Sequence, residues 1–167
     1  RYLKGEIVSI GSAASNWVRK EMSSRRGVMA FVSQWHPHGI YMGKKFVSQE
    51  DFFGQFDRLI IQNLVNYAED KNKRFMIIPR HAKGSKMRIK EEAYYRSIAA
   101  SEPEYLDAEG FYPGYTAVDV AEVVVMVDST LGYESIARGN KTAIFSIRGG
   151  LLGLPDWTYG WPADFPD

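Results

Sequence analysis

Short apolar runs alternate with segments of helical periodicity along this chain. Residues 28–33, 75–78 and 123–127 are continuous apolar stretches that are too short for helices and rich in strand-forming side chains. Between the first two runs, apolar side chains recur at helical spacing and predict an amphipathic helix, with an apolar face made of Phe52, Phe53, Phe56, Leu59, Ile60, Leu64 and Tyr67. The order is therefore strand, helix, strand.

The second half of the chain continues this alternation. Residues 86–99 predict a helix, residues 101–114 a loop rich in acidic residues, Gly and Pro, and residues 117–121 one or two helical turns. Ser129 can cap a helix that stops at Gly139, and residues 142–146 predict another strand. We therefore predict an α/β fold with a doubly wound, mainly parallel sheet and helices on both faces.

Composition narrows the classes of function. The length of 167 residues fits one ordinary domain. Lys and Arg total 21 against 20 acidic residues, and this net charge of +1 argues against a dedicated nucleic-acid-binding protein. The sequence has no cysteine, which excludes disulfides and thiolate zinc sites and is compatible with a reducing cytoplasm. Its apolar runs are far shorter than the ~20 residues of a membrane-spanning helix.

The turn after residues 123–127 is the first candidate site. In open α/β sheets, ligands bind beyond the carboxyl ends of the strands, where the next helix begins and its free amides favour anions. We expect this turn to hold phosphates and Glu134 to accept hydrogen bonds from ribose hydroxyls; the phosphate residues are Asp128, Ser129, Thr130, Leu131 and Gly132. In the alternative interpretation Ser129 is only a cap, Gly132 only a turn and Glu134 a partner of the helix dipole.

A basic cluster follows residues 75–78. Arg80 and Lys83 are candidates for phosphate binding, and His81 for hydrogen-bond donation or proton transfer. Lys86 and Arg88, further along, are interpreted as solvated basic residues.

Polar residues also end the first core strand. Ser33 and Gln34 are expected near a bound phosphate or sugar. His36 and His38 follow them in WHPHG, but two histidines so spaced lack a third ligand, so no metal site is predicted and their role is left open.

The run VVVMVDSTLGYESIARGNKTAIF resembles the late strand, helix and strand of GT-B glycosyltransferases that build bacterial surface carbohydrates. It is similar to segments of capsule Kdo transferases and surface carbohydrate biosynthesis proteins, and more distantly of teichoic-acid glycerophosphotransferases and non-hydrolysing sugar-nucleotide epimerases. MAFVSQW resembles the first strand and loop of their carboxyl-terminal domain. MIIPRHAKG is similar to the strand and loop often written K-P-H-P, although Arg80 precedes His81 and Ala82 replaces the second proline.

This resemblance implies a Rossmann-like carboxyl-terminal domain of a longer protein. Residues 1–26, with a strand at 6–10 within EIVSIGSAASN and a helix to about residue 21, would form an interdomain strand and linker. Residues 27–148 would form the nucleotide-sugar-binding domain, and residues 149–167 an aromatic and proline-rich tail of a truncated chain.

The resemblance also implies an activity. A sugar would pass from a nucleotide-sugar to a glycan or lipid-linked acceptor, with His81 as the catalytic residue and no cofactor or metal. The partners would include a missing amino-terminal domain. The protein would be cytoplasmic, with peripheral association at the inner face of the membrane through the full-length protein. The alternatives are a nucleotide-sugar epimerase or hydrolase of the same fold, and a non-catalytic scaffold whose partner surface comprises Trp157, Tyr159, Trp161 and Phe165.

Overall fold

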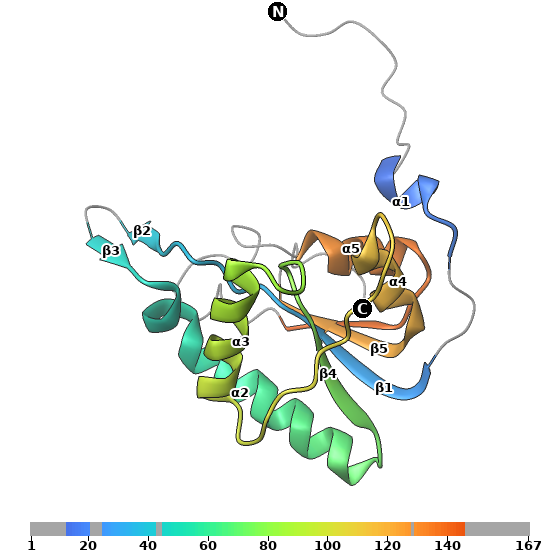
Figure 1. Cartoon of the computed structure of the whole chain (residues 1–167). Coiled ribbons are helices and arrows are strands. Elements are labelled where there is room, and N and C mark those ends of the chain that lie inside the picture. Colours follow the sequence, from blue (N-terminus) through green and yellow to red (C-terminus); the bar gives the residue numbers. More distant parts are fainter. Residues whose placement is uncertain (1–12, 21–24, 43–44, 128, 146–167) are drawn as a thin grey trace, which may run out of the picture.

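Four parallel strands form the central sheet of the protein (Figure 1). The computed structural model describes residues 13–20, 25–42, 45–127 and 129–145. Within them, β1 (Arg25–Val32) pairs on one side with β4 (Arg74–Ile78) and on the other with β5 (Ala121–Met126), and β6 (Thr142–Ile144) pairs with β5. The strand order is β4-β1-β5-β6. The predicted α/β fold with a parallel sheet is confirmed.

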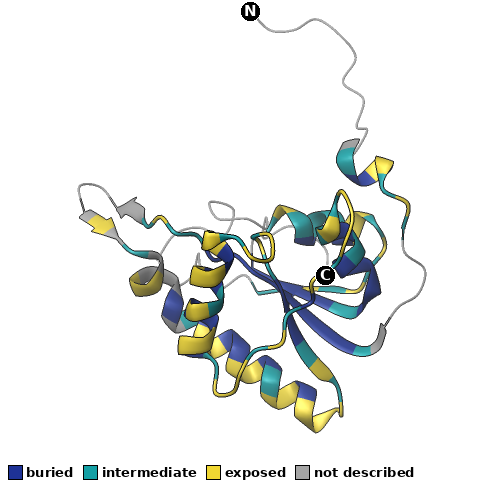
Figure 2. Ribbon diagram, viewed as in Figure 1, coloured by how far each residue is buried: buried dark blue, intermediate teal, exposed yellow. Residues whose placement is uncertain are grey.

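Helices cover both faces of this sheet (Figures 1 and 2). Side chains of β1 alternate between two buried clusters, because successive residues of a strand point to opposite faces. Val28 and Ala30 lie in the cluster that includes residues of α4 (Pro113–Val120) and packs against Leu131 and Tyr133 of α5 (Thr130–Ala137). Met29 and Phe31 lie in the cluster that includes residues of two other helices, α2 (Gln49–Asp70) and α3 (Lys86–Ile98).

From β1 and from β5 the chain moves toward opposite edges of the sheet, although the two strands are parallel. From β1 the chain passes through α2 to β4 at one edge of the sheet, whereas from β5 it passes through α5 to β6 at the other edge. The loops that leave β1 and β5 therefore lead to opposite faces, and a crevice opens between them at the carboxyl ends of these strands.

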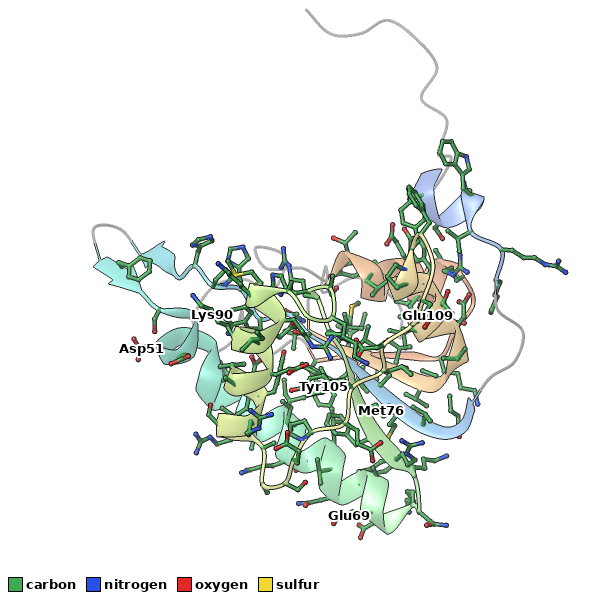
Figure 3. All side chains as sticks on the ribbon, in the orientation of Figure 1. Asp51, Glu69, Met76, Lys90, Tyr105 and Glu109 are labelled. Atoms are coloured by element: carbon green, nitrogen blue, oxygen red, sulfur yellow. The ribbon has the colours of Figure 1, made fainter. Side chains whose placement is uncertain are left out.

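The extended segment between α3 and α4 runs past β4 at the edge of the sheet. It leads from the face of the sheet covered by α3 to the face covered by α4. Tyr105, labelled in Figure 3, forms a parallel bridge with Ile77. The amide of Ile77 donates to the carbonyl of Glu104, and the amide of Leu106 donates to the carbonyl of Ile77, both at 2.8 Å. These bonds pair backbone groups of an edge strand that would otherwise face solvent.

Two small elements lie outside the central sheet. A hairpin of β2 (Ile40–Met42) and β3 (Lys45–Val47) forms a separate antiparallel sheet. The helix α1 (Ala13–Trp17) is fastened by Arg138, which donates at 3.0 Å to the carbonyls of Ser15 and Val18 and forms a buried ion pair with Asp119.

Several expectations are corrected or lie beyond the described residues. No strand was predicted between residues 28–33 and the amphipathic helix, yet β2 and β3 lie there. Leu59 and Tyr67 were assigned to the apolar face of α2, yet they are 58% and 51% exposed. The expected strand at 6–10 and the aromatic tail at 149–167 fall outside the described part of the chain. No helix of the described residues has both the length and the hydropathy to cross a membrane.

Replacement of Gly132 by Ala is expected to destabilise the protein. A β-carbon at Gly132 would lie 1.8 Å from Met126 Sδ and 2.6 Å from Met126 Cγ, so the Met126 side chain or α5 would have to shift within a buried contact. We expect a loss of about 1–3 kcal/mol in the free energy of unfolding, measured by urea denaturation. Gly54→Ala is the matched control, because its nearest neighbour would be Tyr94 Oη at 3.8 Å. That change within α2 should stabilise by about 0.5–1 kcal/mol, and equal effects of both substitutions would contradict the packing role.

Candidate functional site

A cavity of about 900 Å³ opens at the carboxyl ends of β1, β4 and β5. This is the edge of the sheet where the chain reverses direction, which is the position at which open α/β sheets bind ligands. Loops after all three strands contribute to its wall, together with the start of α4 and the segment before it. Its lining comprises Val32, Ser33, Gln34, His36, His38, Gly39, Ile78, Pro79, Arg80, His81, Ala82, Lys83, Leu106, Asp107, Ala108, Pro113, Gly114, Ala117, Ser129, Thr130 and Leu131.

Most of the candidate residues from the sequence line this one cavity. The loop after β1 supplies Ser33 and Gln34, the loop after β4 supplies the basic cluster, and the start of α5 supplies the hydroxyl-bearing turn; together these are Ser33, Gln34, Arg80, His81, Lys83, Ser129, Thr130 and Leu131. Arg80 and Lys83 are exposed, so their charges lie at the solvent side of the wall. Asp128 lies outside the described residues.

The start of α5 faces the cavity with unused backbone donors. Ser129 is the N-cap residue in an extended conformation, and its side chain makes no capping hydrogen bond. The amides of Gly132 and Tyr133 donate to the carbonyl of Ser129 at 3.0 and 3.2 Å. Within the described part of the chain, the amides of Thr130 and Leu131 make no hydrogen bond. Free amides at a helix start carry partial positive charge and favour an anion beside them.

Two residues of the same turn lie apart from the main cavity. Gly132 is buried, and the position of its missing β-carbon is directed at Met126. Its lack of a side chain therefore permits close packing of α5 on β5. Glu134 lines an adjoining pocket of about 200 Å³, which shares Gly114 and Leu131 with the cavity and adds the aromatic side chains of Phe111, Tyr112 and Tyr115.

A buried carboxylate connects the loops after β1 and β4. Glu91, on the second turn of α3, has no exposed surface. Its Oε1 accepts hydrogen bonds from the Ser33 hydroxyl and, at 2.9 Å, from the Arg80 amide. Its Oε2 accepts from the His81 amide at 3.2 Å and lies 3.1 Å from His81 Nδ1. Both loops of the cavity wall are therefore held by one side chain.

Tyr95 extends this network into the core. Its hydroxyl donates to Ser33 Oγ at 3.0 Å, and the Trp35 amide also points to Ser33 Oγ at 3.3 Å. Tyr95 is fully buried, and this burial raises the pKa of its hydroxyl well above the ordinary value. The hydroxyl therefore stays protonated and remains a hydrogen-bond donor.

Arg88 is a buried cation, which corrects its interpretation as a solvated basic residue. Only 2% of it is exposed. It binds Asp107 with two hydrogen bonds of 2.7 and 3.1 Å, binds Glu92 at 2.7 Å, and lies over the Tyr105 ring at 4.5 Å from its centroid. These contacts raise its pKa against the opposing effect of burial. Because Asp107 lines the cavity, Arg88 fixes a second part of the wall.

Gln34 is the polar side chain of the wall whose carboxamide has no partner. It is 9% exposed, and neither its Oε1 nor its Nε2 makes a hydrogen bond to any described residue. A buried amide without partners costs about 1–3 kcal/mol. Gln34 lines the cavity, so a ligand bound there could supply hydrogen bonds that no described residue supplies.

All three histidines of the chain line the cavity. His36 and His38 lie with ring centroids 5.0 Å apart, and the His38 amide donates to His36 Nδ1 at 3.1 Å. The His81 ring meets the Trp35 ring edge to face at 5.6 Å. The described residues contain no group of three side chains suited to hold a metal ion.

Reasoning from the sequence did not identify Glu91, Asp107 or the burial of Arg88. Glu91 and Arg88 lie three residues apart on α3, so both side chains can point from one face of the helix toward the loops. That spacing is common on solvent-exposed helices too, so the sequence alone carried no signal for burial.

The parallel sheet and the cavity beyond its carboxyl edge define a Rossmann-like α/β protein. A family model described as "putative O-antigen biosynthesis protein" matches residues 1–167, and the chain belongs to this family. The description indicates a role in O-antigen biosynthesis and hence in the production of a surface carbohydrate. No curated protein and no solved structure gives a significant match to the chain.

The two buried tyrosine hydroxyls near the cavity are expected to differ in their effect on stability. Tyr95→Phe removes a donor to Ser33 Oγ and should cost about 1 kcal/mol. The Tyr105 hydroxyl is buried without a hydrogen bond among the described residues, and burial raises its pKa to about 12. Tyr105→Phe should therefore leave the free energy of unfolding unchanged or increase it. Denaturant unfolding of both variants measures the difference, and a larger loss for Tyr105→Phe would contradict the assigned network.

Proposed function

We propose that this chain binds a nucleotide-sugar donor in the 900 Å³ cavity and serves the transfer of its sugar to a surface-polysaccharide acceptor. The observation that carries the proposal is that two amides at the start of α5, which make no hydrogen bond to any described residue, meet the cationic loop after β4 at one cavity. Family membership supplies the biological setting, O-antigen biosynthesis.

The phosphates of the donor would lie at the start of α5. The amides of Thr130 and Leu131 are unused within the described residues, and the hydroxyls of Ser129 and Thr130 lie beside them. Hydrogen bonds from such amides to an anionic group are charge-assisted and stronger than those to a neutral one. Arg80 and Lys83 at the rim add positive charge from the opposite wall.

The sugar or its linking phosphate would lie toward the loop after β1. Gln34 offers there both a donor and an acceptor that lack partners. A phosphate has only acceptor atoms, whereas a sugar hydroxyl both donates and accepts, so a sugar satisfies this carboxamide more completely. The adjoining pocket with Glu134 and its aromatic side chains would receive the nucleoside, with Glu134 toward the ribose hydroxyls.

In this proposal, the chain contributes to the reaction mainly by electrostatic stabilisation. Departure of the nucleotide leaves negative charge on a phosphate, and preorganised donors with a helix start stabilise that charge. In the GT-B transferases that the sequence resembles, this stabilisation needs no metal, and the base that activates the acceptor belongs to a separate domain. We therefore assign donor binding and stabilisation of the leaving group to this chain.

Charge at the rim should decide the affinity for nucleotides. Arg80→Ala and Lys83→Ala are each expected to weaken binding of UDP, CMP or GDP by several-fold to about tenfold, with a smaller effect at high salt. Lys86→Ala is the matched control, because Lys86 is exposed on α3 but does not line the cavity. Calorimetric titration measures the affinities. The absence of heat with every nucleotide would favour the scaffold alternative, and equal losses in all three variants would contradict a local site.

The chain by itself should bind donor without turning it over. We expect no released nucleotide when the purified chain is incubated with UDP-, CMP- and GDP-sugars and an acceptor glycan, since the acceptor base is assigned elsewhere. Chromatography of the products checks this. Transfer by the chain alone would contradict the division of roles, and a free or epimerised sugar would instead support the hydrolase or epimerase alternative.

A further inference from the structure

His81 enters the cavity wall with its two ring nitrogens in different surroundings. Nδ1 lies 3.1 Å from Glu91 Oε2, which has no exposed surface. Nε2 makes no hydrogen bond among the described residues, while the His81 side chain is 21% exposed and lines the cavity. The ring therefore has one nitrogen directed into the protein and one available to the cavity.

Hydrogen-bond accounting fixes the direction of each bond to Glu91. The amides of Arg80 and His81 are donors under all conditions. Ser33 Oγ receives the Tyr95 hydroxyl and faces the Trp35 amide, so its single proton points to Glu91. Three donors thus occupy three of the roughly four lone-pair sites of the carboxylate. An ionised Glu91 can only accept, so with Glu91 in that form the fourth contact requires a proton on His81 Nδ1.

We propose that Glu91 is a positioning residue that holds His81 as the Nδ1–H tautomer, so that Nε2 presents a lone pair to the cavity and takes up a proton when an anionic group binds. The proton comes from solvent, and the resulting imidazolium pairs with the anion on one side and with Glu91 on the other. This inference rests on the proposed function only for the identity of the anion, a nucleotide phosphate.

The charges around His81 agree with this arrangement. From α3, Glu91 contacts the ring and Arg88 donates at 3.4 Å to the His81 carbonyl. The loop of His81 itself carries Arg80 and Lys83, the loop after β1 carries the other two histidines, and Asp107 lies on the segment after α3. Arg80 and Lys83 disfavour a further positive charge in the empty cavity, and a bound anion removes that penalty. Glu91 lies on the Nδ1 side of the ring, so an imidazolium formed on anion binding has an acceptor on each side.

The tautomer can be read without any ligand. In nitrogen-15 NMR spectra of histidine rings in the ligand-free protein, we expect His81 to carry its proton on Nδ1. In Glu91→Gln the neutral carboxamide can turn its NH₂ group toward Nδ1, so the Nδ1–H tautomer should no longer dominate. Glu92→Gln is the matched control: it makes the same change one residue away, at a side chain that binds Arg88, and it should leave the tautomer unchanged. A wild-type ring protonated on Nε2 would overturn the proposal, and this result needs no variant to fold.

Proton uptake tests the second half of the inference. Calorimetric titration with UDP near neutral pH, in two buffers of different ionisation enthalpy, measures the protons bound together with the nucleotide. We expect uptake by the wild type and by Glu92→Gln, and a fall of roughly twofold or more in Glu91→Gln. Uptake that is absent in the wild type, or unchanged in Glu91→Gln, would overturn the role of Glu91. If UDP does not bind at all, proton uptake on anion binding fails together with the nucleotide-binding proposal, while the NMR spectra still decide the tautomer.

Discussion

The cavity depends on one buried carboxylate. Glu91 has no exposed surface, and a carboxylate in that position is destabilising unless hydrogen bonds replace the water it has lost. Here the replacements come from the ends of two parallel strands: Ser33 after β1, and the amides of Arg80 and His81 after β4. The loops cannot take other conformations without leaving that charge unpaired, so the requirement to solvate Glu91 also shapes the wall of the site. Arg88 imposes a similar constraint through Asp107.

The fold could be predicted because its signals are local. The apolar runs that became β1, β4 and β5 are short and continuous, and between them the helical spacing of α2 is repeated over several turns. The carboxyl ends of parallel strands share one edge, so the loops that hold Ser33, His81 and Ser129 could be assigned to one site before any contact was known. Leu59 shows the limit of periodicity. The helix α2 has more apolar residues than its buried face can hold, so some of them remain exposed.

The contacts that hold the loops of the site could not be predicted, because they depend on which side chains are buried. Glu91 and Arg88 belong to a helix rich in charged residues, and nothing in the order of residues distinguishes them from exposed neighbours such as Lys90. Gly132 illustrates the same limit. A glycine in a turn after a strand fits ligand approach and helix packing equally well, and its close packing on Met126 could be known only from the structure. The three-residue strands of the hairpin are too short for a periodic signal, so neither strand was predicted.

Arg138 links the end of α5 to the segment that contains α1. This side chain follows α5 directly and joins it to the carbonyls of Ser15 and Val18, more than a hundred residues earlier in the chain. The opposite end of α5 is the helix start that faces the cavity, and eight residues of helix separate the two ends by only ~12 Å. Gly132 allows this helix to pack closely on Met126 of β5. One packed helix therefore links the segment that holds Ser15 and Val18 to the wall of the cavity.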